Sequence, residues 1–143
     1  MTQNTSPIFT LTPDVSNNGS TTIGGSLTTA TGDYTGVSAN HVLEHTAGAN
    51  GSYVRKLRFK ALGTNVATVA RVYLNNGSTH TTGSNNAFYG EVSLPATTAS
   101  NTASTPDIDY SMEIALPAGW TIYVGLATTV AAGWVCTAVT GQY

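Results

Sequence analysis

The chain has 143 residues, of which 41% are hydrophobic and only 8% are charged, and its net charge at pH 7 is −2. This length suits one domain that buries a core without metal or disulfide, and the hydrophobic content argues against disorder. Five Lys and Arg are too few for charge-driven nucleic-acid binding, and no apolar run approaches the roughly 20 residues of a membrane span. We therefore expect neither nucleic acid nor a membrane among its partners.

The first part of the chain, residues 1–19, is predicted to be an extended N-terminal arm, because it holds two prolines and only weak alternation. We expect this arm to become ordered by lying across a neighbouring subunit. It lacks the basic start and apolar run of a signal peptide, which predicts synthesis in a cytoplasm.

The rest of the chain, residues 20–143, is predicted to form one β-sandwich domain. β-Branched residues and Tyr are common, and turn signals recur at the short, even spacing typical of sandwiches and barrels. We expect an eight-stranded jelly roll, with an immunoglobulin-like sandwich as the alternative. The small, polar, proline-bracketed segment 95–106 is predicted to be a long loop. Strands are predicted at about 20–30, 34–46, 52–62, 66–75, 87–94, 107–116, 120–128 and 133–140.

Most of the positive charge lies in one predicted strand, 52–62, which holds four of the five Lys and Arg. Because side chains alternate along a strand, the apolar residues face the core and three of the basic residues face the other way. The apolar face holds Leu57, Phe59 and Ala61, with Arg55 at its edge, and the opposite face holds Lys56, Arg58 and Lys60.

A matching acidic face is predicted on the strand 107–116, whose other face holds five apolar residues from Ile108 to Leu116. The two charged faces have two interpretations. They pair across strands within one chain, or one of them meets a neighbouring subunit and sets its register. The candidate interface residues are Lys56, Arg58, Lys60, Asp107, Asp109 and Glu113.

The segment HVLEH at 41–45 has the spacing of a zinc-binding motif that works on a helix. Here its surroundings predict a strand, on which His41 and His45 would lie about 13 Å apart, too far to share one zinc ion. We therefore expect no metal site.

No nucleophile motif is present, and the regular spacing of the acidic residues favours a solvated or interface face over an acid/base pair. We expect no catalytic residues and no cofactor. Trp120 and the lone Cys136 are predicted to lie in the core, whereas Tyr123 and Trp134 are possible stacking platforms for a sugar.

The runs LRFKALGTNVATVARVYLNNGST (57–79) and LPAGWTIYVGLATTVAAGW (116–134) resemble small β-rich structural proteins encoded among bacteriophage head and tail genes. The segment 45–52 and the ending VTGQY fit the same pattern, so the resemblance covers about two-thirds of the chain. These are turn and strand patterns, and they carry over no functional residue.

The resemblance implies a jelly roll or related sandwich that assembles as a homotrimer. Many such proteins decorate the capsid and contact the major capsid protein, which gives the expected function: a virion decoration, or cement, protein. The alternative is a receptor- or glycan-binding module of a tail fibre.

Overall fold

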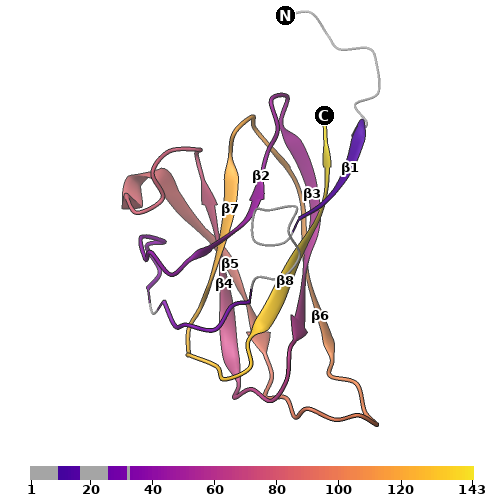
Figure 1. Ribbon diagram of the computed structural model, residues 1–143. Coiled ribbons are helices and arrows are strands. Elements are labelled where there is room, and N and C mark those ends of the chain that lie inside the picture. Colours follow the sequence, from indigo (N-terminus) through magenta and orange to yellow (C-terminus); the bar gives the residue numbers. More distant parts are fainter. Residues whose placement is uncertain (1–9, 17–25, 32) are drawn as a thin grey trace, which may run out of the picture.

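The computed structural model describes residues 10–16, 26–31 and 33–143. It consists of two four-stranded antiparallel sheets that pack face to face as a β-sandwich (Figure 1). Within the described residues, the helical structure is one short 3-10 turn, η1 (Gly83–Asn85). The prediction of an all-β sandwich is therefore confirmed.

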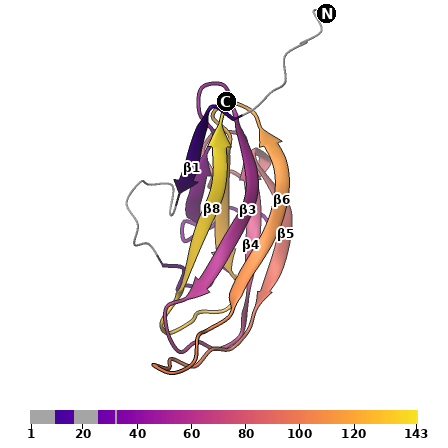
Figure 2. The same ribbon diagram turned by 90° about the vertical axis from the view of Figure 1, so that its right-hand side faces the viewer.

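The first sheet has the strand order β1-β8-β3-β6 and faces the viewer in Figure 2, and the second has the order β2-β7-β4-β5. The first four strands pair with the last four in reverse order: β1 with β8, β2 with β7, β3 with β6, and β4 with β5. The strands are β1 (Thr12–Ser16), β2 (Val42–Thr46), β3 (Ser52–Ala61), β4 (Thr68–Asn75), β5 (Asn86–Leu94), β6 (Asp107–Leu116), β7 (Thr121–Leu126) and β8 (Trp134–Gln142).

The core lies between the sheets and is built from their inward-facing, alternating side chains. On β3, Leu57 and Phe59 are fully buried, as predicted. Ile122 on β7 of the second sheet belongs to the same buried cluster, and Trp134 at the start of β8 is the largest fully buried side chain. Cys136 is also buried, as predicted.

The predicted strands from residue 52 onward match β3 to β8 to within two residues at each end. The two earlier predictions need correction. Residues 26–31 form only isolated bridges, at Leu27 and Ala30, and of the range 34–46 only β2 is a strand. The chain turns at Gly36, whose φ is +76°. Residues 33–41 form no backbone ladder with the second sheet, and the Arg71 and Tyr73 side chains of β4 donate to the Asp33 carbonyl instead. Residues 20–25 lie outside the described residues.

Part of the predicted arm is a strand of the sandwich. β1 lies at the edge of the first sheet and pairs with β8 of the same chain, with Val15 opposite Val139. Pro13 suits this position because an edge strand tolerates a residue without an amide donor. Residues 1–9 and 17–19 lie outside the described residues, so contact of the arm with a neighbouring subunit stays a prediction.

Candidate interface sites

The two charged strand faces lie side by side on the outer surface of the first sheet. β3 pairs with β6 so that Arg58 is opposite Asp109 and Lys60 is opposite Asp107. Lys56 Nζ and Arg58 Nε each lie 2.7 Å from a carboxylate oxygen of Asp109, and Lys60 Nζ lies 2.8 Å from Asp107 Oδ1. Acids of the same chain therefore pair with all three bases. Contact of this face with another subunit stays a prediction.

These ion pairs shift the ionisation of both acids. Hydrogen bonds from Arg58, and then from Lys56, hold the pKa of Asp109 far below its usual range. The hydrogen bond from Lys60 lowers the pKa of Asp107, and Asp109 in turn raises the pKa of the Arg58 guanidinium. All these side chains are partly exposed, so water screens the pairs, and they orient the side chains more than they stabilise the fold.

A β-bulge in the β3–β6 ladder determines where Arg55 and Glu113 lie. The register shifts between Val54 and Lys56, and Arg55 is exposed there. The prediction that Arg55 lies at the edge of the apolar face is wrong, because the bulge interrupts the alternation. Across the bulge Glu113 has a φ of 51°, which is unusual for a residue other than Gly, and it accepts a hydrogen bond from the Tyr53 hydroxyl.

Four of the five residues of the HVLEH segment lie in β2, and His41 directly precedes the strand. The segment therefore lies on a strand, as predicted. A bulge at Glu44 turns both Glu44 and His45 inward, where they are 0% and 1% exposed. His41 instead lies against Tyr73 on the outer side of the second sheet. The two histidines therefore have separate surroundings. Among the described residues, no group of three or more His, Cys, Asp or Glu is arranged to hold a metal ion.

A chain of contacts that we did not predict from the sequence runs through His45. Its Nε2 lies 2.7 Å from Ser52 Oγ, and its Nδ1 lies 3.9 Å from Asp14 Oδ2. The residue types and their order are those of a Ser-His-Asp catalytic triad. However, the Ser52 hydroxyl is fully buried, and 3.9 Å is longer than a hydrogen bond.

We therefore interpret this contact chain as a structural link between β1, β2 and β3. Burial lowers the pKa of His45, and the charge of Asp14 opposes that shift. No sequence motif could have indicated the link, because its three residues come from three separate strands that only the tertiary fold brings together.

The outer face of the second sheet is covered by residues 33–41, which we call the covering segment. The backbone carbonyl of Asp33 accepts hydrogen bonds from the Tyr73 hydroxyl at 2.6 Å and from Arg71 Nη1 at 3.3 Å. The Arg71 guanidinium also lies over the Tyr34 ring, 3.9 Å from its centre. Tyr73 is fully buried under this cover, and burial raises its pKa to about 12.

His41 lies at the end of the covering segment and is buried against the same sheet. Its ring centre is 4.6 Å from that of Tyr73, and Nε2 is 3.7 Å from Asp33 Oδ1. Burial lowers the pKa of His41, and the Asp33 charge opposes the shift. Gly125 makes room for this ring, since a Cβ there would lie 2.4 Å from the His41 Cδ2 atom.

The aromatic residues considered as sugar platforms have different positions. Trp134 is fully buried, so it presents no stacking surface, and Trp120 is half-buried against the core, which supports its predicted position. Tyr123 is half-buried, with its ring stacked on that of His80 at 4.3 Å. The exposed aromatic pair is instead Tyr34 and Phe88, which are 56% and 42% exposed and meet edge to face at 5.3 Å.

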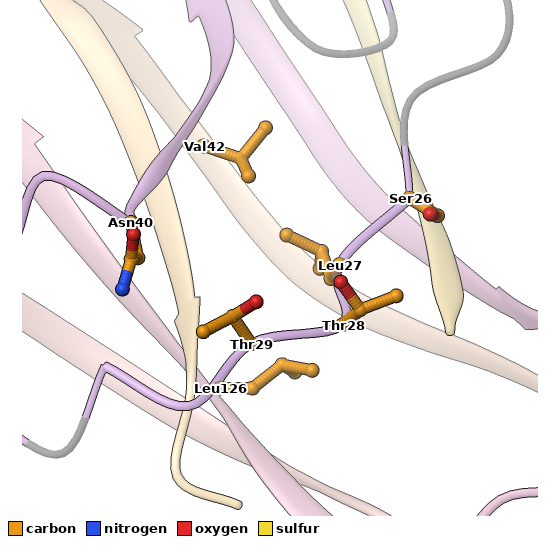
Figure 3. A pocket seen from close by; sticks show the side chains of 7 residues that line it. All are labelled: Ser26, Leu27, Thr28, Thr29, Asn40, Val42 and Leu126. Atoms are coloured by element: carbon orange, nitrogen blue, oxygen red, sulfur yellow. The ribbon is translucent and has the colours of Figure 1, made fainter. Parts of the chain in front are cut away.

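A small cavity of about 130 Å³ opens beside residues 26–29, in the connection between β1 and β2 (Figure 3). Ligand pockets commonly measure about 300–1,000 Å³, so this cavity is too small for a sugar ring with its hydroxyl groups. It is lined by uncharged side chains, namely Ser26, Leu27, Thr28, Thr29, Asn40, Val42 and Leu126.

A second candidate contact surface is the end of the sandwich at the bottom of Figure 1, which we call the Asn65 end. It consists of the loops β3–β4 (62–67), β5–β6 (95–106) and β7–β8 (127–133). The chain has five Lys and Arg plus seven Asp and Glu, and none of these twelve residues lies in the three loops. Leu62 and Val66 are 55% and 56% exposed there.

Asn65 holds this end together. Its backbone exchanges two hydrogen bonds with Thr97, at 2.9 and 3.0 Å. Its buried side-chain amide donates to the Gly133 carbonyl at 3.0 Å and accepts from the amides of Ala132 and Gly133 at 2.9 Å. Asn65 therefore joins all three loops into one preformed surface, and the segment 95–106 is the loop that was predicted.

Comparison with known proteins gives no relative: no family model, no curated protein and no solved structure matches this chain. The resemblance to bacteriophage structural proteins therefore stays a prediction. Within the described residues, no helix is long and apolar enough to cross a membrane.

Proposed function

We propose that this protein is a non-enzymatic structural protein of a bacteriophage virion. Its role would be that of a capsid decoration protein, which forms a homotrimer and stabilises the lattice of the major capsid protein. On this proposal the chain is made in the host cytoplasm and ends on the capsid surface. The proposal combines the sequence resemblance, the order of the strands and the surface of the Asn65 end.

The strand order supports a jelly roll as the particular form of the sandwich. A jelly roll arises when a long antiparallel hairpin folds over, so that the first four strands pair in order with the last four. The pairs β1–β8, β2–β7, β3–β6 and β4–β5 have this pattern. An immunoglobulin-like sandwich pairs several consecutive strands, whereas here β4–β5 is the only consecutive pair among the described strands.

Jelly rolls occur in viral capsid proteins and in lectins, so the fold alone does not choose between the two roles. The observation that favours a structural role is the Asn65 end. The centre of a protein–protein interface is depleted of charged residues, and a preformed surface loses little entropy on binding. Three loops that hold no charged residue and are joined through Asn65 meet both conditions.

The test is co-sedimentation of the purified protein with capsids that lack it, prepared from the phage that encodes it. We expect saturable binding in a fixed ratio to the major capsid protein, and at least a tenfold loss of affinity for Leu62→Asp. The matched control is Ser78→Asp, which adds the same charge at an exposed position in the β4–β5 loop. Absence of binding by the wild-type protein would contradict the proposal.

The exposed Tyr34–Phe88 pair favours one alternative, a glycan-binding module of a tail fibre. Aromatic rings are the usual stacking surface for sugars, but the Arg71 guanidinium already occupies one face of the Tyr34 ring. Saccharide binding that is lost in Tyr34→Ala and Phe88→Ala, and kept in Leu62→Asp, would replace the decoration proposal with this one.

A further inference from the structure

β1 is attached to the sandwich by its backbone and by polar contacts. Among the described strands its one partner is β8, from Thr12 opposite Gln142 to Ser16 opposite Ala138. Within the described residues, β1 contributes nothing to the hydrophobic core. Leu11 beside it and Val15 on it are 81% and 66% exposed. β1 can therefore leave the edge of the sheet without opening the core.

Polar contacts set the register of this strand. The Asp14 carboxylate accepts a hydrogen bond from Gln142 Nε2 at 2.8 Å and lies 3.9 Å from His45 Nδ1. The Asp14 carbonyl accepts another from Thr140 Oγ1 at 3.1 Å. A strand held by a backbone ladder and a few side-chain contacts can also be supplied to a sheet edge by a separate chain.

The chain that follows β1 is long enough to reach a second sandwich. Ser16 and Ser26 are ten residues apart, and ten residues of extended chain span up to about 33 Å. From Leu27 onward the chain is attached to its own core, because Leu27 is 3% exposed and bridges Trp134. β1 therefore precedes Leu27, the first described residue that is attached to the core of its own sandwich.

We propose that β1 is exchanged between copies of this chain, so that β1 of one subunit completes the sheet of the next by pairing with its β8. The occupant of the β8 edge is then a second copy of the same segment. Exchange preserves each contact of β1. Repeated in one direction, it gives a closed ring of subunits when the rotation from one subunit to the next closes. The inference rests on the homo-oligomer part of the proposed function and does not depend on capsid binding.

The experiment traps β1 on its partner strand with a disulfide in the double variant Val15→Cys, Val139→Cys. These residues are directly opposite in an antiparallel pair, at a spacing that a disulfide spans. After oxidation, a non-reducing denaturing gel should show most of the protein as covalent oligomers that a reductant returns to monomers. The matched control is Val69→Cys, Ser93→Cys, which joins β4 to β5 and should give internally linked monomers.

A second arm excludes random cross-linking. Val15→Cys and a size-tagged Val139→Cys are refolded together and oxidised, and the non-reducing denaturing gel should show a covalent pair of the two sizes. Either variant refolded alone should run on the same gel as a single uncrosslinked chain. Cross-linking of the double variant solely within monomers, or a wild-type protein that sediments as a monomer, would overturn the exchange. Capsid co-sedimentation of the same samples separates the two proposals, because internally linked monomers that still bind capsids would contradict exchange alone.

Discussion

The polar residues on the outer faces of the two sheets have opposite surroundings. On the first sheet, Lys56 and Arg58 lie partly in water and both pair with Asp109. On the second, Arg71 and Tyr73 are buried under the covering segment and donate to its backbone. The difference teaches that surface ion pairs add little to stability, whereas a buried polar group must find a partner or destabilise the fold.

The largest expected effect comes from the core beneath the exposed face. Phe59→Ala should lower the free energy of unfolding by about 3–5 kcal/mol, because it removes a fully buried ring between the sheets. Its neighbour Arg58 points to the outer face, so Arg58→Ala should change stability little. Urea unfolding of the two variants measures both. Equal effects would mean that the assignment of faces on β3 is wrong.

The second effect is a loss of stability in mild acid, which comes from the buried histidines. Burial lowers the pKa of both His41 and His45 below the unfolded value of about 6.5. As the pH falls below 6.5, these histidines bind protons in the unfolded chain before they do so in the folded protein. The free energy of unfolding therefore keeps its full value above pH 6.5 and decreases as the pH falls through the pKa values of the folded state.

Each histidine can add a slope of up to about 1.4 kcal/mol per pH unit in this window. Urea unfolding between pH 7.5 and 5 measures the slope, and His41→Asn and His45→Asn should each flatten it. Stability that rises as the pH falls below 6.5 would contradict the burial of both rings.

A smaller effect tests the covered face directly. Tyr73→Phe should cost about 1 kcal/mol, because it removes the hydroxyl that donates to the Asp33 carbonyl and leaves the ring in place. The matched control is Tyr89→Phe, whose hydroxyl is 3.5 Å from the Met112 carbonyl on a partly exposed ring. If both changes cost the same in thermal unfolding, the covering segment does not seal this face.

The smallest effect is expected on the exposed face. Arg58→Glu should leave the melting temperature nearly unchanged, because Arg58 is about half exposed and its partner Asp109 keeps Lys56. In-chain pairing also predicts that sedimentation of the variant equals that of the wild type at low and high salt. Weaker assembly at low salt alone would show instead that this charged face meets a neighbouring subunit.

The same contrast explains how much of the fold could be predicted. β6 has one face in water, so its polar and apolar residues alternate, and its limits were predicted correctly. β4 is buried on both faces, and Arg71 and Tyr73 there gave no indication of the segment that covers them. The alternation of polar and apolar residues along a strand indicates whether one of its faces is exposed to solvent. It does not indicate which distant segment covers a face that is buried.

The sites follow the same rule. The acidic and basic faces were visible as patterns, whereas the pairing of Arg58 with Asp109 depends on the neighbour relation of β3 and β6. The contact of Asp14, His45 and Ser52 requires three strands to meet. The hydrogen bonds of Asn65 likewise require three loops to lie at the same end of the sandwich. Such contacts arise from topology, which strand patterns alone leave open.

Cryo-electron microscopy of virions of the phage that encodes this chain tests the central proposal most directly. The account predicts density for the sandwich on the outer capsid surface, in copies related by a threefold axis, with the Asn65 end against the major capsid protein. Capsids without this density, or density confined to tail fibres, would contradict it.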